Sequence, residues 1–302
     1  MRWLLIGCVA LLAGTAAVAQ PGGRASTSRF QPERESDFEA GLLRRAEQRD
    51  ALHIDVRAKP DRNNARGLVL SGGDAAVIDM EVTGRKYGVS LDGTGDVLIK
   101  NFVFRNRQAK DHFGAGLILG QKEPTRGETF LSNAWIDLEG RGPIPDYKQA
   151  NNEAISVEKG NGPLNVRRAV LVGGEESGLD NKGDVRMDGV FIASGHRSVR
   201  VWGGARLVIA NSIILANRGH TGIWFGGEDG EARFEYYNCL FGEVGDSWED
   251  LSRDPPDWMV QREDDVPVRM RRLERDPFDR GGDSFWTPTQ APVPSGYLRG
   301  RG

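Results

Sequence analysis

A single pattern recurs through the middle of the chain: apolar residues alternate with polar ones, and a glycine stands close by. Alternation over five to seven residues is typical of short β-strands. The equivalent apolar positions recur about every 20 to 38 residues. The segments that share the pattern are YGVSLDG (87–93), AGLILGQ (115–121), EAISVEK (153–159), SGLDNKG (177–183), RSVRVWG (197–203) and TGIWFGG (221–227).

A second strand-like piece follows each of these segments. Asparagine occupies the same place in four of the pieces, at positions 101, 133, 211 and 238. An earlier piece, AAVIDMEVTG (75–84), predicts one more member of the series. The second pieces are VLIKNFVF (97–104), TFLSNAWIDL (129–138), LNVRRAVLV (164–172), VRMDGVFI (185–192), LVIANSIIL (207–215) and FEYYNCLF (234–241).

Two strands per repeat, with glycine and asparagine at the corners, predict an all-β solenoid of stacked coils. One coil cannot bury its own apolar face, so the stacking of neighbouring coils creates the core. A β-sandwich is the alternative, but it predicts hairpin turns rather than one motif that returns at the same phase. The pattern therefore favours a parallel β-helix.

The stretch GLDNKGDVRMDGVFIASG, followed by RSVRVWGGARLVIANSIILAN, resembles the right-handed parallel β-helices of the pectate-lyase-like superfamily. The resemblance covers about residues 65–244. Its coil motifs are specific for the architecture and not for one reaction, so a function has to be argued from a site.

The equivalence of the six segments also predicts which side chains face the core. Side chains alternate across a strand, so positions two apart share a face. The predicted inward pairs are Val89/Leu91, Leu117/Leu119, Ile155/Val157, Leu179/Asn181, Val199/Val201 and Ile223/Phe225. Asn181 is the polar exception, and we expect it to form hydrogen bonds with adjacent coils. The two outward rows are Ser90, Ile118, Ser156, Asp180, Arg200, Trp224 and Asp92, Gly120, Glu158, Lys182, Trp202, Gly226.

The outward rows bring charged and aromatic residues together. Because neighbouring coils lie about 4.8 Å apart, Glu158, Asp180, Lys182 and Arg200 are predicted to form a patch roughly 10 Å across. Two tryptophans, Trp202 and Trp224, flank the patch, and His220 precedes the next coil.

Lyases of the superfamily cleave acidic polysaccharides by β-elimination, with basic residues on one face of the β-helix and calcium held by acidic residues. The resemblance therefore implies that Lys182 and Arg200 act as base and charge neutraliser. It implies Glu158 and Asp180 as ligands of a calcium cofactor, since calcium prefers oxygen donors. Substrate binding would fall to Trp202, Trp224 and His220. A polysaccharide lyase acting on an acidic polysaccharide is the function that this reading predicts.

Three alternatives remain open. Opposite charges on neighbouring strands can simply stabilise the sheet, as Glu158–Lys182 and Asp180–Arg200 pairs would. Glu158 and Asp180 could instead be the two carboxylates of a glycoside hydrolase, although the adjacent aspartates of the polygalacturonase pattern are missing. A non-catalytic carbohydrate-binding or cell-envelope β-helix would need the tryptophans and charges but no base.

The ends of the chain define its organisation. Residues 1–19 have the basic start, apolar stretch and small-residue cleavage site of a secretory signal peptide, which predicts a secreted or periplasmic protein. We expect an N-terminal arm with a capping helix over 20–62, the β-helix over 63–244 and an irregular C-terminal tail over 245–302. Cys239 remains after cleavage, so no disulfide framework is expected.

Charge and hydropathy limit the classes of partner that we expect for this protein. The 302 residues carry a formal charge of −3, which argues against a general nucleic-acid binder. After the signal segment, no stretch is apolar for long enough to span a bilayer. We expect a monomer whose partner is an acidic polysaccharide.

Overall fold

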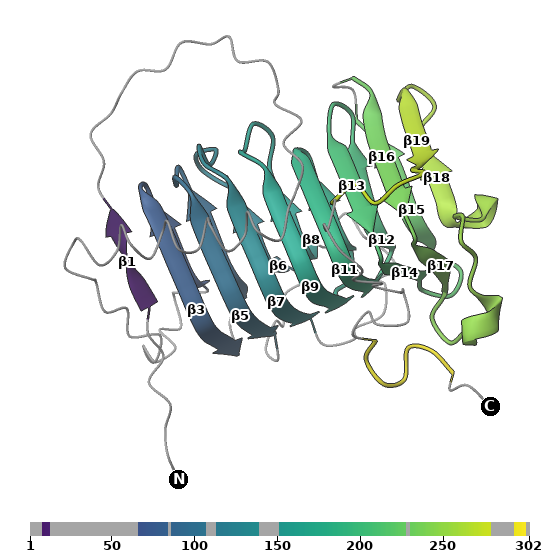
Figure 1. Cartoon of the computed structure of the whole chain (residues 1–302), viewed down its shortest axis with the longest axis horizontal. Helices are drawn as coiled ribbons and strands as arrows, with labels where there is room; N and C mark the ends of the chain where they lie inside the picture. Colours follow the sequence, from purple (N-terminus) through teal and green to yellow (C-terminus); the bar gives the residue numbers. More distant parts are fainter. Residues whose placement is uncertain are drawn as a thin grey trace.

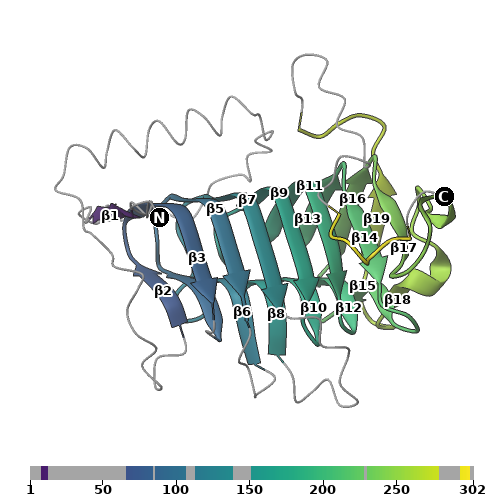
Figure 2. The same ribbon diagram turned by 90° about the horizontal axis from the view of Figure 1, so that it is seen from below.

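The computed structural model describes residues 8–12, 66–83, 86–106, 113–138, 151–227, 230–278 and 293–299. Within these ranges the chain is built almost entirely of strands, and it passes back and forth between two sheets (Figures 1 and 2). Sheet B contains β2 (Arg66–Ser71), β4 (Tyr87–Asp92), β6 (Phe113–Leu119), β8 (Asn151–Val157), β10 (Ser177–Asn181), β12 (Arg197–Trp202), β15 (Thr221–Gly226) and β18 (Val260–Arg262).

The strand that follows each sheet B strand in the chain belongs to sheet A. Its main path is β3 (Asp74–Thr83), β5 (Val97–Arg105), β7 (Thr129–Leu138), β9 (Leu164–Gly173), β11 (Asp184–Ser194), β13 (Arg206–Ala210), β16 (Ala232–Tyr237) and β19 (Val268–Arg272). Two short strands, β14 (Ile213–Ala216) and β17 (Leu240–Glu243), continue the far part of this sheet, and β1 (Cys8–Leu12) pairs antiparallel with β3.

Apart from β1, the strands within each sheet pair in parallel with strands one coil away. Figure 1 shows the strands of sheet A side by side in chain order, and Figure 2 shows those of sheet B along the other side. A coil is here one strand of sheet B with the sheet A strand that follows it. Two parallel sheets joined in this order are compatible with a β-helix.

The predicted register is confirmed. Val89 pairs with Leu117, and Leu117 pairs with Ile155. The ladder continues from Ile155 through Leu179, Val199 and Ile223. All the predicted inward residues are buried, and the side chain of Asn181 donates to the carbonyl of Arg206 in the next coil at 3.0 Å. Stacking of identical positions thus forms one continuous core.

The recurring asparagines form the corner within sheet A. Asn101, Asn133, Asn211 and Asn238 all have positive φ, between 47° and 55°, a conformation that asparagine tolerates better than most residues. Their amides are linked from coil to coil: Asn133 donates to Asn101 at 2.7 Å, and Asn238 donates to Asn211 at 2.8 Å.

Simple alternation fails at the start of the sheet B strands. The small residue before each first inward residue, a glycine in four strands and Ala154 or Ser198 in the other two, also faces the core. A Cβ on Gly178 would lie 2.6 Å from the Ile192 side chain and 2.8 Å from the Ser198 carbonyl. Two consecutive positions therefore point inward, and the residue before the small residue is turned to the outer face. This phase change determines which residues reach the site.

The stack extends beyond residue 244. Strand β18 pairs with β15, and β19 pairs with β16, so part of the expected irregular tail adds another coil. Met259, in the short helix η3 (Asp257–Met259), is fully buried in the main core. Stacked parallel strands therefore continue past residue 244, where the sequence predicts an irregular tail.

Most of the predictions for the N-terminal part of the chain concern residues outside the described ranges. The arm and capping helix over 20–62 lie outside the described residues. Part of the predicted signal peptide forms β1, which a chain processed after residue 19 would lack; cleavage stays a prediction. None of the helices in the described ranges has the length and apolar character needed to cross a membrane.

Candidate functional site

The candidate site is the outer face of sheet B over β8, β10, β12 and β15, here called the sheet B face. The strand register places Asp180 beside Arg200 and Arg200 beside Trp224, as the outward rows predict. Yet Asp180 and Arg200 are 3% and 8% exposed. Both side chains point outward but are buried, because large side chains of neighbouring coils cover them.

Asp180 lies at the centre of the charged residues. Its Oδ1 accepts a hydrogen bond from Nε1 of Trp202 at 2.5 Å and lies 3.5 Å from Nε of Arg200. Its Oδ2 lies 3.5 Å from Nζ of Lys182. One buried carboxylate thus orients an indole and two cations from its own coil and the next, which balances the cost of burying its charge.

Lys182 is held between two carboxylates. Its Nζ contacts both oxygens of Glu158, at 3.0 and 2.9 Å, in addition to Asp180. Burial lowers the pKa of the Lys182 amine, but the charges of Asp180 and Glu158 and the hydrogen bond to Glu158 outweigh this effect, so the pKa is raised. The amine is therefore held protonated.

The expected calcium ligands face this ammonium group. A calcium ion shared by Glu158 and Asp180 would have to displace Nζ of Lys182, which already lies between their oxygens. Across the described ranges, no group of three or more His, Cys, Asp and Glu side chains is arranged to hold a metal ion. The two carboxylates fit a lysine partner better than a calcium ion.

The two predicted tryptophans pack edge to face, with ring centroids 5.1 Å apart. The guanidinium of Arg200 lies 4.9 Å from the Trp202 ring and 5.1 Å from the Trp224 ring, and Arg197 lies over Trp224 at 5.0 Å. Trp224 is 4% exposed, whereas Trp202 remains partly exposed. Trp202 is therefore the tryptophan of this pair that can meet a ligand.

Two buried glutamates belong to the same face but escaped sequence analysis. Glu153 pairs with Ser177 at the start of the strands, where the phase change turns it outward. Burial raises the pKa of Glu153 well above its usual value, and the charges of Asp180 and Glu176 raise it further, against Arg200 and Lys182. Burial also raises the pKa of Glu176, against the opposing effects of Arg200 and of a hydrogen bond with Glu153.

The glutamates form a carboxyl pair anchored by arginine. Arg200 donates from Nη1 to Oε1 of Glu176 at 2.5 Å, which favours the charged form of that residue. Of the two, Glu153 has the pKa that is raised well above its usual value, so it is the member that holds its proton more tightly. The cations of the face, Lys182, Arg197 and Arg200, lie among the carboxyl groups of Glu153, Glu158, Glu176 and Asp180.

His220 lies at the opposite end of the strands from Lys182. It ends the turn before β15, and its ring packs edge-on against His196 at 4.8 Å. Burial, and then the charge of His196, lower the pKa of His220. His220 therefore borders the sheet B face near Glu176 and Arg197 and does not join Lys182 and Trp202.

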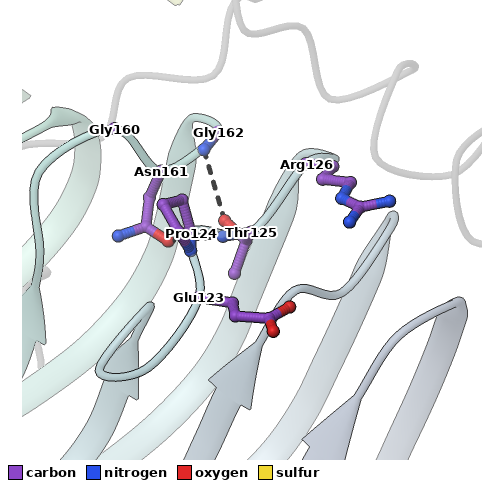
Figure 3. Close-up of a pocket in the computed structure, with 7 residues that line it drawn as sticks. All are labelled: Glu123, Pro124, Thr125, Arg126, Gly160, Asn161 and Gly162. Carbon is purple, nitrogen blue, oxygen red and sulfur yellow. Dashed lines mark hydrogen bonds between the residues drawn. The ribbon is translucent and has the colours of Figure 1, made fainter. Parts of the chain in front are cut away.

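A cleft of about 580 Å³ lies near the Glu158 end of the face, between the loops that follow β6 and β8 (Figure 3). Asn161, in its wall, donates to the Glu158 carbonyl at 2.5 Å and accepts from the Thr125 backbone at 2.7 Å. Gly162 donates to the Thr125 hydroxyl at 3.2 Å, so the two loops are tied together. None of the residues predicted for the site lines this cleft.

The fold and the site define an all-β protein of two parallel sheets that carries a buried charge network and a partly exposed tryptophan on one face. Comparisons with models of protein families, with curated proteins and with solved structures gave no match. The function is therefore argued from the sheet B face.

Proposed function

We propose that this is an exported right-handed β-helix protein of the pectate-lyase-like type that binds a carbohydrate chain on the sheet B face. The observation that carries the proposal is Trp202, a partly exposed indole fixed through Nε1 by the buried Asp180. Flat aromatic side chains bind the C–H surfaces of sugar rings, and tryptophan loses little conformational freedom when it is already held in place.

The polar groups beside Trp202 support the same proposal. Lys182 and Glu158 have side chains 28% and 34% exposed, so the rim of the platform offers both donors and acceptors for sugar hydroxyls. Glu158 directly follows β8, Lys182 directly follows β10 and Trp202 ends β12, so the three side chains belong to adjacent coils.

The balance of charges bears on which glycans would bind. Lys182, Arg197 and Arg200 lie among four carboxyl groups, those of Glu153, Glu158, Glu176 and Asp180, so the face has no excess of positive charge with which to attract an acidic polymer. We therefore expect retention of the glycan to depend weakly on salt, because screening acts mainly on unmatched exposed charges. Strong loss of retention at high salt would favour the acidic polysaccharide instead.

Elimination from an acidic polysaccharide is the second candidate, supported by the meeting of Lys182 and Arg200 around Asp180. That reaction needs an unprotonated base, whereas the environment of Lys182 raises its pKa. Hydrolysis by Glu158 and Asp180 would require carboxylates free to reach a sugar, and both are engaged by Lys182. Binding is therefore the function that we favour.

The test uses the purified protein in native gels that contain pectate, alginate, chondroitin sulfate or arabinoxylan, with parallel absorbance assays for unsaturated sugar ends. We expect retarded migration with at least one polysaccharide and no rise in ultraviolet absorbance. Unchanged migration in every gel would overturn the proposal. Release of unsaturated products, lost in Lys182→Ala, would establish the lyase.

A further inference from the structure

Trp258 is the most exposed large aromatic side chain in the described part of the protein, with 54% of its surface accessible. It belongs to η3, directly before β18, and was not among the residues that the sequence pattern singled out. Isolated apolar side chains at a surface are common, so exposure alone carries no function. Its position in the stack is what gives it significance.

Trp258 lies just beyond the sheet B face, in the short helix that leads into the neighbouring strand β18. Val260 pairs with Ile223, and counting back two residues puts Trp258 level with Thr221 in β15 and, one coil further, with Arg197 in β12. Met259 confirms the phase, because its side chain packs over Gly222, at the inward position of the preceding coil. If Met259 points inward, its neighbour Trp258 belongs to the outer row that also contains Glu153.

Polar groups occupy the surface between the partly exposed Trp202 and the exposed Trp258. Thr221 donates from its hydroxyl to Oε1 of Gln261 at 3.2 Å, and both side chains are at least partly exposed. A coil spacing of about 4.8 Å and a strand rise of about 3.3 Å per residue put Trp202 and Trp258 roughly 15–20 Å apart. This separation exceeds the size of one sugar ring.

We propose that Trp258 is a second aromatic platform for the same glycan, which would run diagonally across the sheet B face from Trp202 to Trp258. The inference rests on the proposed function and adds to it a preference for long chains. A short oligosaccharide contacts one platform. A longer one contacts both, and its second contact forms at the high effective concentration that the first one creates.

The experiment compares wild type, Trp202→Ala, Trp258→Ala and Trp135→Ala, the last changing a tryptophan of β7 in sheet A. Each is titrated calorimetrically with fragments of two and of six sugar units from the polysaccharide that retains the wild type. We expect Trp258→Ala to weaken binding of the six-unit fragment at least 10-fold and that of the two-unit fragment less than 2-fold. Trp202→Ala should weaken both.

The outcomes separate this inference from the proposed function. Loss of binding in Trp202→Ala with an unchanged length dependence in Trp258→Ala overturns the second platform and leaves the first. A wild type retained by none of the four polysaccharides overturns both. Binding of anionic lipid vesicles that requires Trp258, while glycan binding does not, would assign Trp258 to a membrane surface and contradict the inference.

Discussion

Asp180 accepts a hydrogen bond from the indole N–H of Trp202 at 2.5 Å while it lies within 3.5 Å of both Lys182 and Arg200. The same carboxylate therefore connects the buried charges to the exposed aromatic ring. A change to this buried network is expected to alter the orientation of Trp202, and so the surface offered to a ligand.

Removing the Asp180 carboxylate should destabilise the protein and release Trp202. Because Asp180→Ala removes a buried carboxylate that Arg200 and Lys182 share, we expect a loss of about 3–5 kcal/mol in the free energy of unfolding, measured in urea. Asp180→Asn keeps an acceptor for the indole, so it should preserve the tryptophan emission wavelength better than Asp180→Ala. Equal red shifts in the two variants would contradict the role of this hydrogen bond.

The raised pKa of Glu153 predicts that stability falls as pH rises. The folded state keeps a proton that the unfolded state loses near pH 4.3, so the contribution of Glu153 to stability declines from there through its raised folded pKa. Each tenfold difference in the protonation equilibrium corresponds to about 1.4 kcal/mol. Glu153→Gln mimics the protonated form. Its unfolding free energy should therefore fall less than that of wild type between about pH 5 and about pH 8, a range above the pKa of an unfolded glutamate.

Comparing the pH dependence of the unfolding free energy of wild type and of Glu153→Gln separates the effect of the Glu153 carboxyl group from that of the histidines. The pKa of His220 is lowered in the folded state, so its contribution to stability rises with pH through about 6.5 and opposes that of Glu153. Both proteins carry His220, so its effect cancels in their difference. Parallel pH profiles of wild type and Glu153→Gln would refute the raised pKa.

The Lys182–Glu158 pair should contribute little to stability because both side chains are about one third exposed. A double-mutant cycle with Lys182→Ala and Glu158→Ala should give a coupling energy of about 0.2–1 kcal/mol, which decreases in high salt. A coupling energy several times larger, measured by urea unfolding, would show that the pair is more than the rim of a binding surface.

Calcium should have no effect on the sheet B face, since the Lys182 ammonium already contacts Glu158 and Asp180. We expect the melting temperature to be the same in excess calcium chloride and in EDTA. Glu158→Gln serves as the control for nonspecific salt effects. A calcium-dependent rise in melting temperature that is lost in Glu158→Gln would instead support the metal site that the family resemblance implies.

The repeated coil could be recognised from sequence because each inward position is filled by an apolar residue at the same phase. Asn101 and its equivalents likewise revealed the corner, where a positive φ favours asparagine. Glu153 could not be placed by strand alternation, because two successive residues after it face the core. A small residue directly before the first inward apolar residue, Ala154 before Ile155 or Gly178 before Leu179, was the available signal for that phase change.

Burial of the site was also beyond the reach of the sequence pattern. Alternation correctly predicts that Asp180 and Arg200 face outward. It does not predict how far the side chains of Trp202, Trp224 and Arg197 cover them. Whether Lys182 has a lowered or a raised pKa depends on the distance to Glu158 and Asp180, which only the packed structure provides. Trp258 was missed because its coil was assigned to an irregular tail.

Affinity for the retaining polysaccharide in Trp202→Ala, measured beside Trp135→Ala, tests the central claim most directly. Trp135 is a partly buried tryptophan on sheet A, so it controls for the general effect of removing an indole. We predict at least a 10-fold loss of affinity in Trp202→Ala, with folded-state circular dichroism retained, and less than a 2-fold loss in Trp135→Ala. Unchanged affinity in folded Trp202→Ala would contradict a glycan-binding sheet B face.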